Sequence, residues 1–409
     1  MRYVIIGNSA AGVAAAEGIR SRDKSGEIVM ISEEKFPAYG RPLISYYLLG
    51  ATDRAHMDYR PSDFYEKNGI TLRLGVRAEK IDPVGHTVLL SDGSEIGYDR
   101  LLAATGSRSF VPPTKGLSEV KAKYTFMTLA DALALEKALS KKKEVLIVGA
   151  GLIGLKCMEG ILGRVKKVTV IDMADRVLSS ILDEKGSQIV QRQLEARGVR
   201  FVLSDSVVRF EAGRAKLKSG GEIAFDLLVM AVGVRPNIEL VKEAGGKTDR
   251  GIVTDEGMRT SLPDVYAAGD CTESSDIASG KRRILALLPN AYRQGYCAGE
   301  NMAGGDARFG DAMPLNAIGF FGSHILTAGA YEGESFITGE GDTYRRFFVK
   351  DGVLKGFILI GAPERAGIYT ALVRERRSLS EVDFEMLKTE PRLSAFSAEE
   401  RKKALAAEV

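Results

Sequence analysis

The sequence contains two glycine-rich turns, at residues 7–12 and 149–154, and each follows a short apolar strand. In such a turn the first glycine makes a sharp bend and the second lets the backbone approach a pyrophosphate, while the third lets the next helix pack closely. The phosphates rest on the free N–H groups and positive dipole of the helix start. This spacing predicts that one chain binds two dinucleotides.

The second turn is the more complete of the two. It has all three glycines, Gly149, Gly151 and Gly154, and the strand after it ends at Asp172, which lies 172 − 154 = 18 residues past the last glycine. A carboxylate at this spacing binds a ribose 2′-OH and repels the 2′-phosphate of NADP. NAD is therefore favoured. NADP is the alternative, because an arginine near this position, here Arg176, can accommodate the 2′-phosphate. Leu152 and Ile153, which lie between Gly151 and Gly154, are also expected to contact the nucleotide.

The first turn departs from the pattern at one position. Ser9 stands between Gly7 and Gly12, where the middle glycine is expected, and Ala10 and Ala11 complete the turn. Serine is small, and its hydroxyl can itself face a phosphate. The turn therefore predicts a second nucleotide site, which its better-formed counterpart downstream supports.

An acidic residue also follows the first turn. The strand over residues 28–31 leads to Glu33, which lies 33 − 12 = 21 residues past Gly12. This spacing suits a ribose ligand, and the adjacent Glu34 is the alternative.

Length and composition narrow the class of protein. A chain of 409 residues suggests about two or three domains, and 57 basic against 54 acidic residues give a net charge of +3, too balanced for a nucleic-acid binder. Short basic clusters at 141–143, 281–283 and 374–377 are interpreted as solvated surface. The first strand begins almost at Met1 and no apolar run could span a bilayer, so we expect a cytoplasmic protein without a membrane span.

The three cysteines are Cys157, Cys271 and Cys297, and none belongs to a CxxC or metal-ligand pattern. We therefore expect no dithiol relay, no protein-bound iron–sulfur cluster and no metal site. The histidines, His56 and His86 among them, fall in no catalytic arrangement.

The order of the apolar segments predicts an α/β fold. We expect two Rossmann-like dinucleotide-binding domains, the first discontinuous, and a C-terminal α+β domain with a polar helical extension. The predicted domains are 1–107 with 233–310, then 108–232, 311–380 and 381–409. The predicted helices include 129–140, 184–197, 291–302 and 366–377, and the predicted C-terminal strands include 346–349 and 353–360.

In combination, these pieces resemble the FAD-dependent pyridine nucleotide oxidoreductases, the two-dinucleotide-binding flavoproteins. Over about residues 1 to 380 the chain is most similar to the NADH:rubredoxin oxidoreductase and ferredoxin reductase branch, and also to the flavin portion of nitrite reductase large subunits. The motifs are the two glycine turns, Arg41-Pro42 with Ser45, Ala104-Thr105-Gly106, Gly233-Val234-Arg235-Pro236 and Ala268-Gly269-Asp270.

The resemblance implies that FAD occupies the first site and NADH the second. Asp270 would bind the ribityl or pyrophosphate region, although an aspartate after a strand could instead cap a helix. The FAD residues implied are Gly7, Ser9, Gly12, Glu33, Arg41, Pro42, Thr105, Gly106 and Asp270, with Asn290 and Gln294 near the isoalloxazine ring. The NADH residues implied are Gly149, Gly151, Gly154, Asp172 and Gly233.

The sequence departs from the family at the flavin. Tyr39 stands about where disulfide reductases have a redox cysteine, so the electrons are expected to pass directly from flavin to acceptor. The electron-transferase branch usually has a lysine–glutamate ion pair where this chain has Tyr46 and Lys156. We hypothesise that Lys156 stabilises anionic reduced flavin, with Tyr46 or Tyr39 stacking near the ring. The alternative is that Lys156 is a solvated surface residue.

The function that the resemblance implies is an NADH-dependent FAD oxidoreductase. NADH would pass a hydride to flavin N5, and electrons would then go to a small iron–sulfur carrier such as rubredoxin or a ferredoxin, docked near residues 281–283. One alternative is the NADH-oxidising flavin subunit of a larger iron–sulfur complex, such as an oxoacid oxidoreductase or a nitrite reductase-like assembly. Direct reduction of oxygen or peroxide, and a non-enzymatic flavoprotein scaffold, are further alternatives. Either a monomer or a homodimer is compatible with the sequence.

Overall fold

A computed structural model of the chain describes residues 1–406, which form two compact units. The first unit holds Met1–Leu178, Gln191–Ser274 and Arg283–Gly310. The second holds Ser179–Val190, Ser275–Arg282 and the described residues from Asp311 onward. The last three residues of the predicted extension, 407–409, lie outside the described residues.

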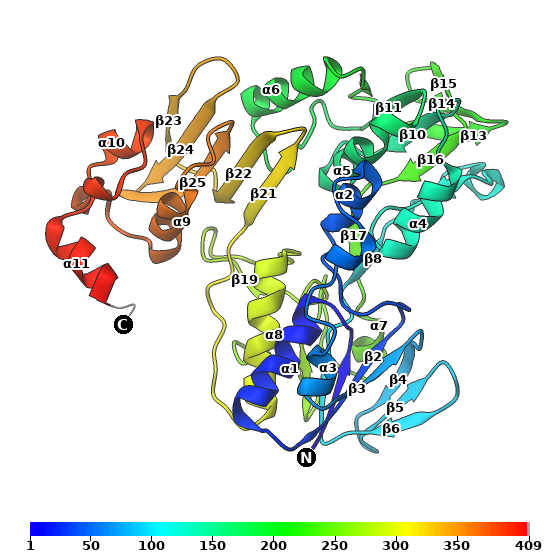
Figure 1. Cartoon of the computed structure of the whole chain (residues 1–409), viewed down its shortest axis with the longest axis vertical. Coiled ribbons are helices and arrows are strands. Elements are labelled where there is room, and N and C mark those ends of the chain that lie inside the picture. The colour runs from blue at the N-terminus through cyan, green and yellow to red at the C-terminus, as the bar shows by residue number, and fades with distance from the viewer. Residues whose placement is uncertain (407–409) are drawn as a thin grey trace. The chain divides into compact units, whose positions relative to one another are not determined.

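The N-terminal strand is the centre of a five-stranded parallel sheet in the order β18-β7-β1-β2-β3. Figure 1 labels β2 and β3 of this sheet. Val4 and Ile5 on β1 are fully buried, as expected of a parallel strand covered on both faces. Beside the sheet α1 and α8 lie in close contact, because a Cβ on Gly295 would stand 2.1 Å from the Ala11 carbonyl oxygen. The bounds are β1 (Arg2–Ile6), α1 (Ala10–Arg22), β2 (Glu27–Ser32), α2 (Leu43–Leu49), α3 (Phe64–Lys67), β3 (Ile70–Leu74), β7 (Arg100–Ala103), α7 (Glu239–Glu243), β18 (Val265–Ala267) and α8 (Leu288–Met302).

The second glycine turn belongs to a sheet of the same kind, in the order β12-β11-β10-β16-β9. All of its paired strands are parallel. In both sheets the glycine turn follows the central strand and the order reverses there, which is where α/β sheets bind ligands. The bounds are β9 (Lys123–Tyr124), α4 (Leu129–Ala138), β10 (Glu144–Val148), α5 (Leu152–Ile161), β11 (Lys167–Ile171), α6 (Glu184–Glu195), β12 (Arg200–Val202) and β16 (Leu227–Met230).

Smaller sheets accompany the two large ones. Each of these two sheets is accompanied by a three-stranded antiparallel sheet. Strand β8, which follows β7, pairs with β17, which follows β16. The bounds are β4 (Ala78–Asp82), β5 (Thr87–Leu90), β6 (Glu95–Gly97), β8 (Ser107–Ser109), β13 (Val207–Glu211), β14 (Arg214–Leu217), β15 (Glu222–Ala224), β17 (Val234–Pro236), β19 (Ser274–Ser275) and β20 (Arg282–Arg283).

The second unit is built on an antiparallel sheet in the order β21-β22-β25-β24-β23. Phe347, Phe357 and Tyr369 fill its core. Asp183, from the middle of the chain, accepts hydrogen bonds from the Tyr344 hydroxyl at 2.6 Å and from the Arg346 guanidinium at 2.7 Å. The bounds are β21 (Leu315–Phe320), β22 (Ser323–Gly329), β23 (Glu334–Thr338), β24 (Tyr344–Lys350), β25 (Val353–Ile360), α9 (Ala366–Glu375), α10 (Phe384–Thr389) and α11 (Ala398–Ala406).

The segment after residue 380 packs against this core. Leu387 and Ala395 are buried in the same cluster as Tyr369, whose hydroxyl donates to the Leu387 carbonyl oxygen. The domain boundary predicted at 380 stays a prediction, but residues 381–396 are not a free polar tail.

The predicted helices are confirmed, with ends that differ by up to three residues. The largest difference is at α8, which begins at Leu288 rather than Ala291. Pro289 explains the early start, because proline is favoured in the first helical turn, where its missing N–H has no partner to lose. Within residues 1–406, no helix combines the length and apolar character needed to cross a membrane.

Candidate dinucleotide sites

The first and third glycines of the N-terminal turn are fixed by the protein itself. Gly7 has φ +123°, and a Cβ on it would lie 2.1 Å from the Ala104 carbonyl oxygen. A Cβ on Gly12 would lie 1.9 Å from the carbonyl oxygen of Gly7. Any side chain at either position would therefore displace the turn or the neighbouring strand end.

The second turn repeats this geometry and separates the three glycines by role. Gly149 has φ +118°, and a Cβ on it would lie 2.2 Å from the Ala231 carbonyl oxygen. A Cβ on Gly154 would lie 2.0 Å from the carbonyl oxygen of Gly149. A Cβ on Gly151, by contrast, would meet no protein atom within 4 Å. Protein packing thus accounts for the outer glycines but not for the middle one, whose bare backbone faces space that a pyrophosphate would fill.

Both helices that follow the turns begin without protein caps. Ser9 is the N-cap of α1 and Gly151 that of α5, and in neither case does a side chain accept a hydrogen bond from the first turn. Neither first turn contains an acidic residue. The positive ends of both helices are therefore open to an anionic ligand, and the turns fit the phosphates of dinucleotides.

Two further glycines stand at neighbouring strand ends. Gly106 (φ +63°) and Gly233 (φ +109°) have no protein atom within 4 Å of a notional Cβ. Beside them the Asn237 side-chain amide donates to the Thr105 carbonyl oxygen at 2.8 Å, and the Thr105 hydroxyl donates to the Asn237 carbonyl oxygen at 2.7 Å. The Thr105 side chain therefore ties together the two strand ends, and Asn237, which the sequence analysis missed, is its partner.

The three candidate ribose acids differ in their surroundings. Glu33 is exposed at the end of β2, whereas Glu34 is held by Arg41 and by the Tyr39 hydroxyl. Asp172 accepts hydrogen bonds from the backbone N–H groups of Ala150 (2.6 Å) and Ala174 (2.8 Å). Each of its oxygens has a further lone pair, so Asp172 can still accept from a ribose hydroxyl.

Arg41 lies at the centre of a polar network beside the first turn. Its guanidinium pairs with Glu34, donates to the Ser9 hydroxyl at 3.3 Å and donates to the Met127 carbonyl oxygen at 3.3 Å. These contacts connect the first turn with the residues that precede α4.

Tyr39 takes part in the same network. Its hydroxyl donates to Glu34 at 2.7 Å and accepts from the Leu129 backbone N–H at 2.8 Å. Burial raises the pKa of the Tyr39 phenol well above its usual range, so the hydroxyl stays protonated. Tyr39 is therefore a fixed hydrogen-bonding residue in the segment where the family resemblance implied a redox cysteine in disulfide reductases.

The residues after β18 and on α8 form a second polar group. Burial raises the pKa of the Asp270 carboxyl, although Arg41 opposes the change, and the contact of Asp270 with the Ser107 hydroxyl is long, at 3.5 Å. Gln294 accepts from the Gly269 N–H at 2.8 Å and donates to Ser274, so its amide supports the loop that carries Asp270. Asn290 is buried on the same helix.

Lys156 is not a solvated surface residue. Its side chain is 15% exposed, its ammonium pairs with the buried carboxylate of Glu159, and it lies 4.3 Å from the ring centroid of Tyr46. Tyr46 is on α2, where Pro42 is the N-cap, and α2 packs closely on α5 because a Cβ on Gly160 would approach the Ser45 carbonyl oxygen to 2.9 Å. The partner Glu159 was missed in the sequence, although its i,i+3 spacing from Lys156 is a visible signal.

The cysteines are not placed for thiol chemistry. All three are free and buried, and burial raises the pKa of each thiol. The Cys271 sulfur contacts the carbonyl oxygens of Ala103 (3.4 Å) and Ala268 (3.3 Å). Buried thiols of high pKa are poor nucleophiles. Among the described residues no group of three or more His, Cys, Asp or Glu is arranged to hold a metal.

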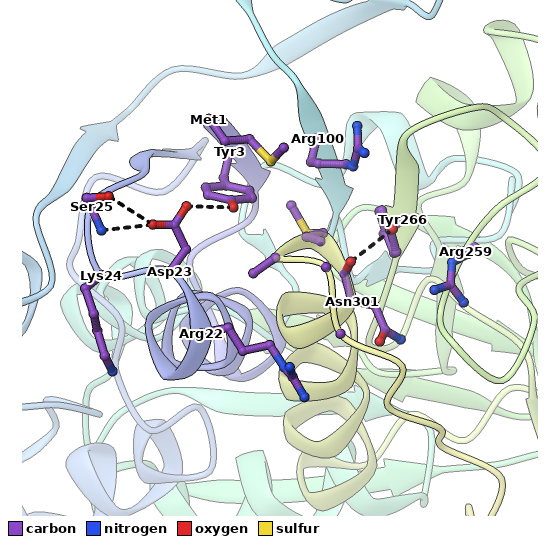
Figure 2. Close-up of a pocket in the computed structure, with 14 residues that line it drawn as sticks. Met1, Tyr3, Arg22, Asp23, Lys24, Ser25, Arg100, Arg259, Tyr266 and Asn301 are labelled. Carbon is purple, nitrogen blue, oxygen red and sulfur yellow. Dashed lines mark hydrogen bonds between the residues drawn. The ribbon is translucent and has the colours of Figure 1, made fainter.

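A cavity of about 670 Å³ lies at the other end of the first sheet, near the start of β1 (Figure 2). Of the five charged side chains that line it, Arg22 pairs with Glu300, Arg100 with Asp264, and Asp23 with the Tyr3 hydroxyl. It is remote from the glycine turns, which follow the carboxyl ends of the strands, and it is not part of either dinucleotide site.

Comparison with known proteins agrees with this geometry. The family model "Pyridine nucleotide-disulphide oxidoreductase" matches residues 1–295. The chain is 29% identical to the NADH-dependent phenylglyoxylate dehydrogenase subunit epsilon of Aromatoleum evansii, over 93% of each chain. It is 36% identical to the NADH oxidase of Methanocaldococcus jannaschii, over 76% of this chain and 71% of that protein.

A solved structure shows the same architecture. The reductase in the covalent putidaredoxin reductase–putidaredoxin complex superposes with a TM-score of 0.88 at 25% identity, covering 95% of this chain and 96% of the other. The paired glycine turns, the fold and the family match thus agree with one another. The chain belongs to the pyridine nucleotide-disulphide oxidoreductase family and is an FAD- and NADH-dependent oxidoreductase.

Proposed function

We propose that the chain oxidises NADH through FAD and passes the electrons to an iron–sulfur protein without a protein thiol in between. The observation that carries this proposal is the Tyr39 network, because the segment beside the first turn holds a protonated phenol locked to Glu34 and Leu129. The similarity to a reductase solved in complex with putidaredoxin supports a protein acceptor.

In this proposal the first turn, with Arg41, Asp270 and Glu33, holds FAD. The second turn, with Asp172 and Gly233, holds NADH. When bound, the two cofactors supply hydride transfer and the release of single electrons. The chain contributes two uncapped helix ends for the phosphates and a ribose acid at each site.

A second candidate function is favoured by one relative. The phenylglyoxylate dehydrogenase subunit epsilon, which is one subunit of a larger enzyme, matches along 93% of each chain. The two proteins are therefore similar over nearly their whole length. The acceptor would then be another subunit of a complex rather than a diffusing carrier. The exposed side chains of residues 281–283 stay a candidate contact for an acidic carrier.

Anaerobic titration tests the common part of both proposals. The FAD-loaded protein should lose its yellow colour with NADH, and ferredoxin or rubredoxin should then restore the colour much faster than oxygen does. Rapid restoration by oxygen alone would contradict the proposal and favour an oxidase. Co-purification with iron–sulfur subunits from the native source would select the complex over the carrier.

The charge of Lys156 provides a separate prediction about flavin potential. Removing it in Lys156→Met should lower the midpoint potential of the bound FAD, because a positive charge nearby favours the more anionic reduced form. A change of about 30 mV corresponds to about 1.4 kcal/mol for a two-electron couple. Spectroelectrochemical titration measures this potential directly.

Variants of Glu159, the buried partner of Lys156, show whether a change in potential comes from charge. Glu159→Gln should shift the potential in the opposite direction, and the double variant Lys156→Met with Glu159→Gln should return close to the wild type. The double variant also avoids leaving one buried charge without its counterion. If all three potentials equal that of the wild type, Lys156 has no electrostatic role at the flavin.

A further inference from the structure

The sheet that carries the second glycine turn has an unusually basic opposite edge. Because its strands are parallel, their amino ends lie together at the edge away from the turn. The pairing places Lys167 beside Glu144 and Arg200 beside Thr169, and the Lys166 N–H bonds to the Lys143 carbonyl oxygen at 2.9 Å. We define the basic edge as Lys121, Lys123, Lys141, Lys142, Lys143, Lys166, Lys167 and Arg200, at or just before the starts of β9, β10, β11 and β12.

Few carboxylates balance these charges. Lys166 pairs with Glu144 at 2.7 Å and Lys143 approaches Asp226 at 3.6 Å. Eight cations and these two acids give 8 − 2 = +6, whereas the whole chain of 409 residues has a net charge of +3. The rest of the chain therefore sums to 3 − 6 = −3. The positive charge of the protein is concentrated on this edge, at a cost in self-repulsion.

The other side chains of the edge limit the kind of partner. Most of the cations are exposed, and seven of the eight are lysines. The large hydrophobic residues that are strongly exposed in the described chain lie in other segments, and the aromatic residue beside the edge, Tyr124 on β9, is only partly exposed. The edge therefore offers no strongly exposed apolar or aromatic side chain to insert into a bilayer or to stack on bases. Lysine rows of this kind complement the acidic surface of another protein.

We propose that the basic edge docks an acidic surface of a partner polypeptide. A five-residue strand spans about 16 Å, and β10 separates the edge from the second glycine turn by that length. A partner held there leaves the turn open to NADH. The edge is therefore an assembly contact that holds a partner subunit, distinct from the contact at which an acceptor takes up electrons, and the proposal goes beyond the oxidoreductase activity.

Charge reversal on the FAD-loaded protein tests this proposal. The probe is a fluorescein-labelled oligoglutamate peptide, with binding followed by fluorescence anisotropy at low ionic strength. The triple variant Lys121→Glu, Lys142→Glu and Arg200→Glu should bind the peptide at least tenfold more weakly than the wild type. These three residues are exposed and lie outside both dinucleotide sites.

A matched control changes net charge equally elsewhere. Lys80→Glu, Lys247→Glu and Arg250→Glu also replace two exposed lysines and one exposed arginine, and this variant should stay within twofold of the wild type. Equal losses in the two triple variants would overturn the proposal, because net charge alone would then explain binding. Tighter binding of duplex DNA or phosphatidylserine vesicles at the same edge would overturn it in favour of those ligands. Bleaching by NADH should be unchanged in both variants, so the test is independent of the activity.

Discussion

Replacing Gly151 by alanine is expected to leave the protein folded and loaded with FAD while weakening NADH binding fivefold or more. A Cβ at this position meets no protein atom within 4 Å, and Gly151 has φ −82°, which alanine adopts freely. Nothing in the protein therefore opposes the substitution. The added methyl group would instead occupy the space that the pyrophosphate needs, and overpacking of this kind costs about 1–3 kcal/mol. Isothermal titration with NAD⁺, together with the melting temperature, measures both effects.

Gly149→Ala is the matched control, because it adds the same methyl group two residues away. Its φ of +118° and the 2.2 Å approach to the Ala231 carbonyl oxygen require the turn itself to move. This variant should lose thermal stability as well as NADH affinity, whereas Gly151→Ala should lose affinity alone. Unchanged NAD⁺ binding in Gly151→Ala would show that the nucleotide does not pass over the middle glycine.

The second large effect is expected at Arg41. Arg41→Gln should weaken FAD binding roughly tenfold to a hundredfold, since hydrogen bonds to charged groups contribute about 1.5–3 kcal/mol. The guanidinium contacts Glu34, Ser9 and the Met127 carbonyl oxygen, so the substitution also leaves the Glu34 carboxylate with Tyr39 alone. Titration of the apoprotein with FAD, followed by flavin fluorescence, gives the dissociation constant.

Variants of the two glutamates separate the roles within this network. Glu33→Gln should weaken FAD binding if Glu33 is the ribose ligand, whereas Glu34→Gln should act mainly by loosening Arg41. Arg41→Lys should recover part of the affinity because it keeps the charge without the planar donor geometry. FAD binding equal to the wild type in Arg41→Gln would remove Arg41 from the proposed site.

The elements and turns could be predicted because their signals are local. Apolar runs of four or five residues mark the strands. The third glycine of each turn is required by the first glycine, which lies only five residues earlier. The first glycines, Gly7 and Gly149, instead meet Ala104 and Ala231 at the ends of neighbouring strands, but the spacing of the motif already marks them. A motif defined by backbone bends therefore carries over from sequence to structure with little loss.

The side-chain partners could not be predicted in the same way. Thr105 and Asn237 exchange hydrogen bonds across 132 residues, and Tyr39 reaches Leu129 across 90. Such pairs depend on how the chain packs, and polarity alone marks neither partner. The packing of Leu387 and Ala395 was missed for a related reason, because their segment is mostly polar and only a few apolar residues turn inward.

The contact of Asp183 with Tyr344 bears on the order in which the chain can fold during synthesis. The two residues are separated by 161 positions, which a ribosome needs roughly 10–30 s to translate at about 5–20 residues per second. Strand β18 likewise completes the first sheet, and helix α8 packs beside it on α1, long after β1 has emerged. The nascent chain must therefore keep apolar strands incompletely covered for many seconds. During synthesis, chaperones are expected to bind such strands until β18 and α8 have been made.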